Sequence, residues 1–278
     1  MRKEFLIGCS TALLVMVLSA TLVVGFLWHQ QTLQVVRVHV PVDALPSAWH
    51  GTRIGLISDL HIGAHMSAAR VKQVVRRLNA QKPDLVMIAG DTVDAKVTQS
   101  AEAAPALRAL HALEAPHGVY HILGNHDTRR AKLWRPLLQE GGIRVLENEH
   151  VRLQKAGDTL YLVGLADALN GRLDADRAWH SIPKEACVIA AVHEPDAADD
   201  LVGRPLALQL SGHSHGGQIV LPFSRPRSLP PLGRKYPSGL YTTEAGHLVY
   251  TTRGVGTSQI PFRLFARPEI TIITLQRE

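Results

Sequence analysis

The sequence predicts an α/β protein with two β-sheets flanked by helices, preceded by one transmembrane helix. Three observations favour this fold class. A charge-free apolar run opens the chain, strand-length apolar runs then alternate with helical segments, and the last strand-like runs follow one another without helices between them. The chain has 278 residues, of which 46% are hydrophobic, and is long enough to bury the core of one sizeable domain.

The N-terminal segment predicts a membrane anchor, residues 1–31, ahead of a single domain, residues 32–278. No charged residue occurs from Phe5 to Trp28, and a helix of that length reaches roughly 35 Å, enough to span a hydrocarbon core of about 30 Å. The alternative is a cleaved signal peptide, whose apolar core is usually only about 7–15 residues long. Because Arg2–Lys3 precede the run and Arg37 is the first basic residue after it, the N-terminus is expected in the cytoplasm and the domain outside it.

Nine apolar runs have the length and composition of strands. They are Val35–Val42, which alternates like an edge strand, Arg53–Ser58, Asp84–Ala89, Gly118–Leu123, Thr159–Leu165, Cys187–Val192, Leu206–Leu210, Leu248–Thr252 and Ile270–Leu275. Ser67 is placed to cap a helix whose apolar positions are Val71, Val74, Val75 and Leu78. Further helices fit about 101–114, 130–140 and 196–202. The early strands predict a mostly parallel sheet, and the late ones a second, more antiparallel sheet.

Five polar clusters each follow a strand-like run directly. They are Asp59–His61, Gly90–Asp94, Gly124–Asp127, His193–Pro195 and Gly212–His215. Each cluster alone is weak evidence for a functional site, because Gly, Asn and Asp favour turns and a single histidine at a strand end is usually structural. Together they are expected to converge, because open α/β sheets build their sites beyond the carboxyl ends of strands. Carboxylate, carboxamide and imidazole groups without thiolates suit Mn, Fe or Zn ions.

The order of these motifs, D-x-H, G-D-x-x-D, G-N-H-D, H and G-H-x-H, resembles the calcineurin-like metallophosphoesterases from about Arg53 to the C-terminus. The segments Gly212–Gln218, Gly239–Tyr241 and Thr252–Thr257 resemble one subgroup, the bacterial membrane-associated phosphodiesterases of the YkuE/YaeI type. The resemblance implies that the two mixed sheets pack as a sandwich. It also implies two divalent metal ions, and a catalytic domain outside the bacterial inner membrane.

The resemblance further implies a role for each polar side chain. The ligands of the first metal would be Asp59, His61 and His215. Those of the second would be Asn125, His193 and His213, and Asp91 would bridge the two ions. His126 would contact the phosphate or protonate the leaving group, with Asp127 orienting its ring, and Asp94 would hold the loop or a ligand by hydrogen bonding.

Such a site would hydrolyse phosphoester bonds. Two divalent ions bring four positive charges, two aspartates remove two, and the neutral histidine and asparagine ligands remove none, so the site attracts a phosphate anion. The metal pair would lower the pKa of a shared water from about 15.7 to about 7 and supply a bridging hydroxide as nucleophile. Histidine is the side chain most often used to protonate a departing alkoxide, which suits His126 to this role.

A Pro-rich segment after the last motif is basic. Its basic residues are Arg225, Arg227, Arg234 and Lys235, with no acid before Glu244. Such a segment is either a solvated surface loop or a binding site for an anionic head group at a membrane. The predicted substrate is therefore a small anionic or lipid-linked phosphodiester or phosphomonoester, such as a phospholipid or a nucleotide-linked glycolipid precursor.

Two other functions remain open. The pI of about 9.5 is consistent with a nuclease, but aromatic residues are only 5% and no basic stripe is interleaved with them, which argues against nucleic acid. A non-catalytic metal-binding scaffold of the same fold would carry the same motifs. Turnover of a phosphoester by the metal-loaded protein separates the scaffold from the enzymes.

Overall fold

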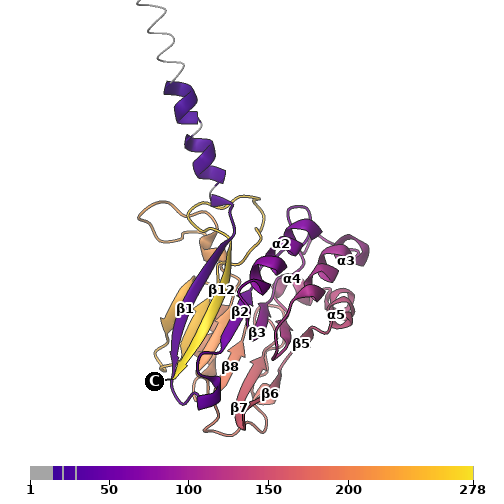
Figure 1. The fold of residues 1–278 in the computed structure, drawn as a ribbon, viewed down its shortest axis with the longest axis vertical. Helices are drawn as coiled ribbons and strands as arrows, with labels where there is room; N and C mark the ends of the chain where they lie inside the picture. The colour runs from indigo at the N-terminus through magenta and orange to yellow at the C-terminus, as the bar shows by residue number, and fades with distance from the viewer. Residues whose placement is uncertain (1–14, 21, 29, 278) are drawn as a thin grey trace, which may run out of the picture.

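The computed structural model describes residues 15–20, 22–28 and 30–277, and places two six-stranded sheets face to face (Figure 1). The first sheet has the order β1-β12-β2-β3-β4-β5 and the second the order β10-β11-β9-β8-β7-β6. The first comprises β1 (Gln34–Val42), β2 (Arg53–Ile57), β3 (Leu85–Ala89), β4 (Val119–Ile122), β5 (Arg144–Leu146) and β12 (Glu269–Arg277). The second comprises β6 (Glu149–Lys155), β7 (Asp158–Gly164), β8 (Val188–Ala191), β9 (Leu208–Ser211), β10 (Gly239–Thr242) and β11 (Leu248–Thr251). The predicted pair of mixed sheets is confirmed.

The main core lies between the two sheets. Leu56 and Met87 from the first sheet pack with Ile189 and Leu210 from the second, and all four are fully buried. Every residue of β3 is buried, as expected for a strand covered on both faces. This apolar layer fixes the two sheets against each other and so fixes the loops that leave their edges.

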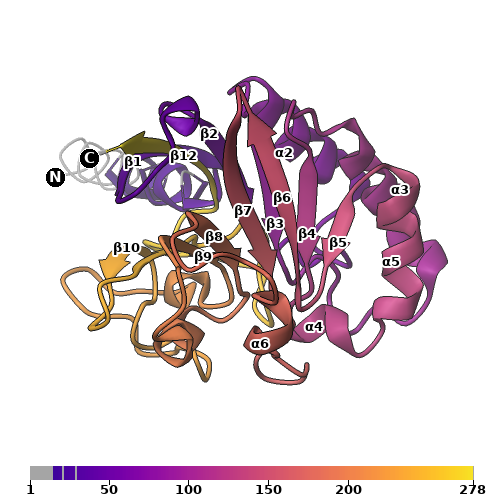
Figure 2. The same ribbon diagram turned by 90° about the horizontal axis from the view of Figure 1, so that it is seen from below.

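Three helices cover the outer face of the first sheet (Figure 2). They are α2 (Ala68–Asn79), α3 (Ser100–Ala109) and α5 (Ala131–Glu140). Ser67 caps α2 as predicted, accepting a hydrogen bond from the backbone nitrogen of Arg70 at 3.4 Å, and the four predicted apolar positions of this helix are buried. The shorter helical segments are η1 (Ser47–Trp49), η2 (Leu110–Ala112), α4 (Asn125–Thr128), α6 (Ala175–Ala178), η3 (Pro195–Leu201) and η4 (His215–Gly217).

The second sheet is the more antiparallel of the two, as expected, with two antiparallel pairings out of five against one out of five in the first. The antiparallel pairings are the two outer ones, whereas the three central pairings, β7 with β8, β8 with β9 and β9 with β11, are parallel. The connection from β8 to β9 contains the short helix η3 and returns the chain across the sheet, which makes these two strands parallel. Strands β5, β6 and β10 lie outside the nine predicted runs. In β6 and β10, exposed and partly buried positions dilute the apolar signal.

The N-terminal segment is helical where it is described, at residues 15–20 and 22–28, and it rises from one end of the domain (Figure 1). Its large apolar side chains are exposed, Trp28 to 76%. Among the described residues, no helix is both long enough and apolar enough to cross a membrane. Residues 1–14, 21 and 29 of the predicted anchor, residues 1–31, lie outside the described part of the chain.

Candidate metal centre

All five polar clusters lie beyond the carboxyl ends of strands, at one edge of the sandwich. Three follow β2, β3 and β4 of the first sheet, which are mutually parallel, and two follow β8 and β9 of the second. Backbone hydrogen bonds join the loops of the two sheets: the nitrogen of His213 donates to both carboxylate oxygens of Asp59 at 3.1 Å, and that of Gly256 donates to the Asp59 carbonyl at 2.7 Å. The predicted convergence of the clusters is therefore present.

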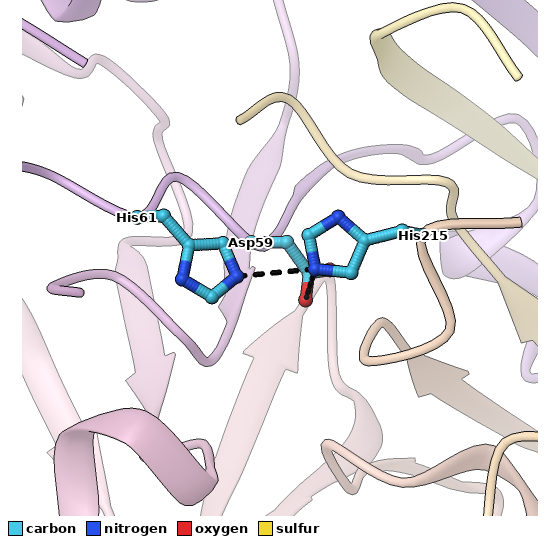
Figure 3. A group of neighbouring side chains, drawn as sticks. All are labelled: Asp59, His61 and His215. Atoms are coloured by element: carbon cyan, nitrogen blue, oxygen red, sulfur yellow. Dashed lines mark hydrogen bonds and ion pairs between the residues drawn. The ribbon is translucent and has the colours of Figure 1, made fainter. Parts of the chain in front are cut away.

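Asp59, His61 and His215 form the first group of side chains (Figure 3). The Nε2 atoms of His61 and His215 are 3.1 Å apart, and Nε2 of His215 lies 3.5 Å from Oδ1 of Asp59. The two imidazole rings stack with their centroids 5.0 Å apart. All three residues are buried, and their ligand atoms lie close enough together to hold one metal ion.

Asp91, His193 and His213 form a second group of the same kind. Nε2 of His193 lies 3.3 Å from Oδ2 of Asp91, and the rings of His193 and His213 meet edge to face at 5.0 Å. The Asp91 carboxylate also lies 3.7 Å from Nε2 of His61 in the first group. Asp91 thus stands between the two groups.

The hydrogen bonds of the second group fit a bound cation. Nδ1 of His193 donates to the Ala89 carbonyl at 2.6 Å, and Nε2 of His213 donates to the Pro231 carbonyl at 2.8 Å, which leaves the opposite ring nitrogens free to coordinate. The side-chain oxygen of Asn125 and Nε2 of His193 are buried without a hydrogen-bond partner among the described residues. Buried polar atoms of this kind need a partner, and a divalent ion supplies one.

A third group contains His126, which the sequence did not predict as a ligand. The ligand atoms of His61, Asp91 and His126 also lie close enough together to hold an ion. His126 is half-buried, with Nε2 4.0 Å from Oδ2 of Asp91, and its Nδ1 accepts a hydrogen bond from the backbone nitrogen of Ala95 at 3.3 Å. The ring therefore faces the centre from the edge of α4.

Three imidazoles of the centre are neutral at neutral pH. Burial lowers the pKa of His61 to about 4 and that of His213 to about 4, and it holds the pKa of His215 well below its usual value. Neighbouring histidines add to this effect. A neutral imidazole keeps the lone pair that binds a metal.

His193 behaves differently. Burial is the largest single effect and lowers its pKa, but the carboxylates of Asp91, Asp59 and Glu194 together outweigh burial and hold the pKa of His193 well above its usual value. Burial raises the pKa of Asp91, and the neighbouring histidines, His193 foremost, together outweigh that effect and hold the pKa of Asp91 well below the usual range. Burial raises the pKa of Asp59 to about 6, against the lowering effect of His193. In the metal-free protein, the proton on His193 thus places a positive charge beside the Asp91 carboxylate, a position that also suits a metal cation.

Backbone strain is concentrated at the same residues. Five of them adopt the left-handed conformation, with positive φ values for Asp59 (53°), His61 (46°), Asp91 (50°), His213 (70°) and His215 (52°). This conformation costs a residue other than glycine on the order of 1–3 kcal/mol and persists where the surroundings enforce it, as in functional sites. The strands end sharply at these residues and so turn their side chains into one pocket.

Asp127, expected to orient the ring of His126, makes its hydrogen bonds within the described residues to backbone nitrogens instead. Its carboxylate is buried and accepts hydrogen bonds from the backbone nitrogens of Thr92, Val93 and Gly124 at 2.9–3.1 Å, so it ties the loop after β3 to the loop after β4. Asp94 lies near a predicted ligand: its Oδ2 is 3.9 Å from Nδ1 of His61.

The four basic residues of the Pro-rich segment lie apart from the cleft over the centre. Nζ of Lys235 pairs with Oδ2 of Asp199 at 2.8 Å, and the backbone of Arg234 donates to Asp196. Arg225 and Arg227 are exposed. The basic side chains are thus absent from the described lining of the cleft, to which the segment contributes Ser228–Pro231.

The cleft has a volume of about 450 Å³ and two chemically different surfaces. Its floor contains Asp91 and the candidate ligands around it. Its walls include Leu169, Ile219, Leu229 and Ile260, from three different loops. An anionic group fits the floor, and an apolar portion of the same molecule fits the walls.

Two buried charged residues near the centre were missed in the sequence. Nη2 of Arg263 lies 3.1 Å from Nδ1 of His215, and Nη1 donates to the His215 carbonyl at 3.2 Å. Glu194 is fully buried, and burial raises its pKa to about 8. Arg263 sits in an irregular loop 48 positions after His215, so no local signal predicted its burial.

This fold and this cluster of carboxylate, amide and imidazole groups are typical of metal-dependent hydrolases. A family model described as calcineurin-like phosphoesterase matches residues 52–217, and the chain belongs to this family. It is a metal-dependent phosphoester hydrolase.

The chain is similar to several bacterial and animal proteins. It is 34% identical to the uncharacterized metallophosphoesterase YkuE of Bacillus subtilis, over 99% of this chain and 97% of the relative. It is 30% identical to the phosphodiesterase YaeI of Escherichia coli, over 80% and 82%. It is 33% identical to a transmembrane protein with metallophosphoesterase domain of Danio rerio, of which the alignment spans 63%. The sulfate thiohydrolase SoxB of Thermus thermophilus shares the fold, with a TM-score of 0.51 at 14% identity.

Replacement of Gly212 tests how tightly the first group is packed. A Cβ atom at position 212 would lie 2.5 Å from Oδ2 of Asp59 and would also collide with Ser58. We expect Gly212→Ala to lower the affinity for Mn or Zn by roughly 10–100-fold, measured by calorimetry. Gly25→Ala is the control, because a Cβ there meets no atom within 4 Å. Unchanged affinity in a folded Gly212→Ala protein would contradict this account.

Metal binding should release protons at neutral pH. His193 is protonated in the metal-free protein, and Asp59, with a pKa of about 6, becomes protonated as the pH falls through that value. Both protons must leave for coordination, so affinity is expected to rise with pH and to weaken most below pH 6. Calorimetry at pH 7 in two buffers of different ionisation enthalpy measures the release, and identical heats in both buffers would refute it.

Proposed function

We propose that the chain hydrolyses phosphodiester bonds with two divalent metal ions held where the loops of the two sheets meet. Under this proposal, the ligands of the first ion are Asp59, His61 and His215, those of the second are Asn125, His193 and His213, and Asp91 bridges the two. The observation that carries the proposal is the position of the Asp91 carboxylate, within 3.7 Å of a histidine from each group. Mn, Fe and Zn all accept this set of ligands.

Bound divalent ions supply a nucleophile at neutral pH and neutralise the negative charge of a phosphate. The chain itself supplies fixed ligands and a proton donor. Asp91 and His193 are buried away from water, and the backbone strain at the ligands fixes them before substrate arrives. His126 stands at the edge of the cleft floor, partly open to solvent, where it can donate a proton to the departing alkoxide.

The proposed substrate is a phosphodiester with an apolar portion, such as a phospholipid or a nucleotide-linked glycolipid precursor. The apolar walls above a polar floor support it, as does the name of YaeI, a phosphodiesterase. We also propose that residues 1–31 anchor the domain on the outer face of a bacterial inner membrane, with the N-terminus in the cytoplasm. The apolar run and the transmembrane name of the Danio rerio relative support the anchor.

Removal of the bridging carboxylate tests the proposed function. We expect Asp91→Asn to lower kcat/KM for bis(nitrophenyl) phosphate by roughly 10³-fold, equivalent to about 4 kcal/mol, because one ligand is shared by both ions. Asp43→Asn is the control, since Asp43 is exposed and follows β1 at the opposite edge. Full metal occupancy of the unaltered protein without turnover of any phosphoester would favour the scaffold, and cleavage of oligonucleotides but not lipids would favour the nuclease.

The role of His126 is tested by varying the leaving group. We expect His126→Ala to lower kcat by about 10²–10⁴-fold for an alkyl leaving group, and far less for nitrophenolate, which needs no protonation. Metal content should remain at two ions per chain. His65→Ala serves as the control, because His65 is exposed and does not line the cleft. Loss of one ion in His126→Ala would instead make His126 a ligand.

A further inference from the structure

We propose that an exposed apolar and basic surface beside the cleft docks onto the surface of an anionic phospholipid bilayer. The surface belongs to two loops, one between η4 and β10 and the other between β11 and β12. We call it the apical surface, and its members are Leu221, Phe223, Arg225, Arg227, Ile260 and Phe265.

The apolar members of the apical surface are unusually open to solvent. Phe223 has an exposed fraction of 110%, as large as in an extended chain, and the fractions for Leu221 and Ile260 are 56% and 53%. Phe265 is 43% exposed. Several large apolar side chains gathered at one end of a water-soluble domain mark a surface that a partner covers.

The two loops are held together as one body. The side chain of Gln218 donates to the carbonyls of Ser258 and Ile260 at 3.0 and 2.9 Å and accepts from the Ser258 nitrogen at 2.8 Å. A short ladder continues this contact, with the nitrogen of Val220 donating to the Leu264 carbonyl at 2.9 Å. The apolar side chains therefore stand on a braced platform rather than on two independent loops.

The N-terminal helix leaves the domain from this platform. The side chain of Gln30 accepts from the nitrogen of Phe265 at 3.0 Å, and that of Gln31 bonds to both the nitrogen and the carbonyl of Arg263. The ring of Phe26 packs on that of Phe265 with centroids 5.5 Å apart. In Figure 1 the helix rises from the end where both loops lie. The exposed apolar side chains of the helix and of the apical surface thus continue one another.

The charge of the apical surface favours anionic lipid. Arg225 and Arg227 follow Phe223 by two and four positions, and no acidic residue occurs from Leu221 to Lys235. Basic residues beside exposed aromatic and aliphatic side chains suit the interface of a bilayer, where the rings enter the head-group layer and the guanidinium groups meet lipid phosphates. A protein partner accounts for an apolar patch, but not for its continuity with an apolar helix.

Docking would place the metal centre at the head-group layer. Ile219 and Ile260, from the two braced loops, also line the cleft, so the mouth of the cleft adjoins the apical surface. A phosphoester in the bilayer would reach the floor of the cleft without crossing bulk water. The docking itself does not depend on catalysis.

Site-specific fluorescence on the full chain tests the docking. The natural thiols are removed by Cys9→Ser and Cys187→Ala, and an environment-sensitive nitrobenzoxadiazole label is attached at Phe223→Cys. The control label is at Ala156→Cys, exposed in the β6–β7 turn, which lies at the amino end of β7 and thus at the opposite edge of the sandwich. Both proteins carry the same N-terminal segment and are mixed with vesicles of phosphatidylcholine, with or without phosphatidylglycerol.

We expect the label at position 223 to shift to shorter wavelength, and to be quenched by doxyl-labelled lipid, in phosphatidylglycerol vesicles, while the label at 156 changes in neither respect. Arg225→Ser combined with Arg227→Ser should weaken the effect of phosphatidylglycerol. Equal behaviour of the two labels would overturn the docking, and an equal response in both vesicle types would overturn the anionic preference. Because the readout needs no turnover, failure of the proposed enzymatic reaction would leave this result unaffected.

Discussion

The structure depends on keeping two buried carboxylates among buried histidines at the meeting point of two sheets. Asp59 and Asp91 are fully buried, and burial opposes the charged form of each, so an isolated carboxylate here would be strongly destabilising. His193 offsets part of this cost in the metal-free protein, and metal ions would offset the remainder. The apolar layer between the sheets stabilises the fold, and so do the helices packed on the outer face of the first sheet. Together they offset the free-energy cost of such a site.

The loops after the last parallel strands connect the metal centre to its surroundings. Pro231 accepts from the ring of His213, so the Pro-rich segment orients one candidate ligand, and Arg263 contacts both the ring and the backbone of His215. Arg263 is in turn bound through its backbone by Gln31 at the foot of the N-terminal helix. The foot of that helix is thus linked to His215 through Arg263, and the Pro-rich segment is linked directly to His213.

The sequence predicted the parts of the molecule whose signal is local. Strand β3 is an uninterrupted apolar run, β2 is apolar after Arg53, and Ser67 predicts the start of α2. Each polar cluster follows its strand directly. The rest arises from contacts that are distant in sequence. The parallel centre of the second sheet depends on the path of the chain through η3, and the burial of Arg263 depends on contacts with His215 and Gln31, both distant in sequence. Asp127 shows the same limit: its neighbour in sequence is His126, but its hydrogen bonds go to backbone atoms of another loop and of Gly124.

The floor and the walls of the cleft are built from different parts of the fold. The floor is built from strand ends, where the sheets fix each side chain to within a fraction of an ångström, and metal chemistry requires that precision. The walls are built from loops whose side chains, such as Leu169, Leu229 and Ile260, are apolar and partly exposed. Apolar walls discriminate poorly between individual molecules but well between molecules with and without an apolar portion. A polar floor fixed by strand ends thus lies under apolar walls, and the two surfaces suit chemically different parts of one ligand.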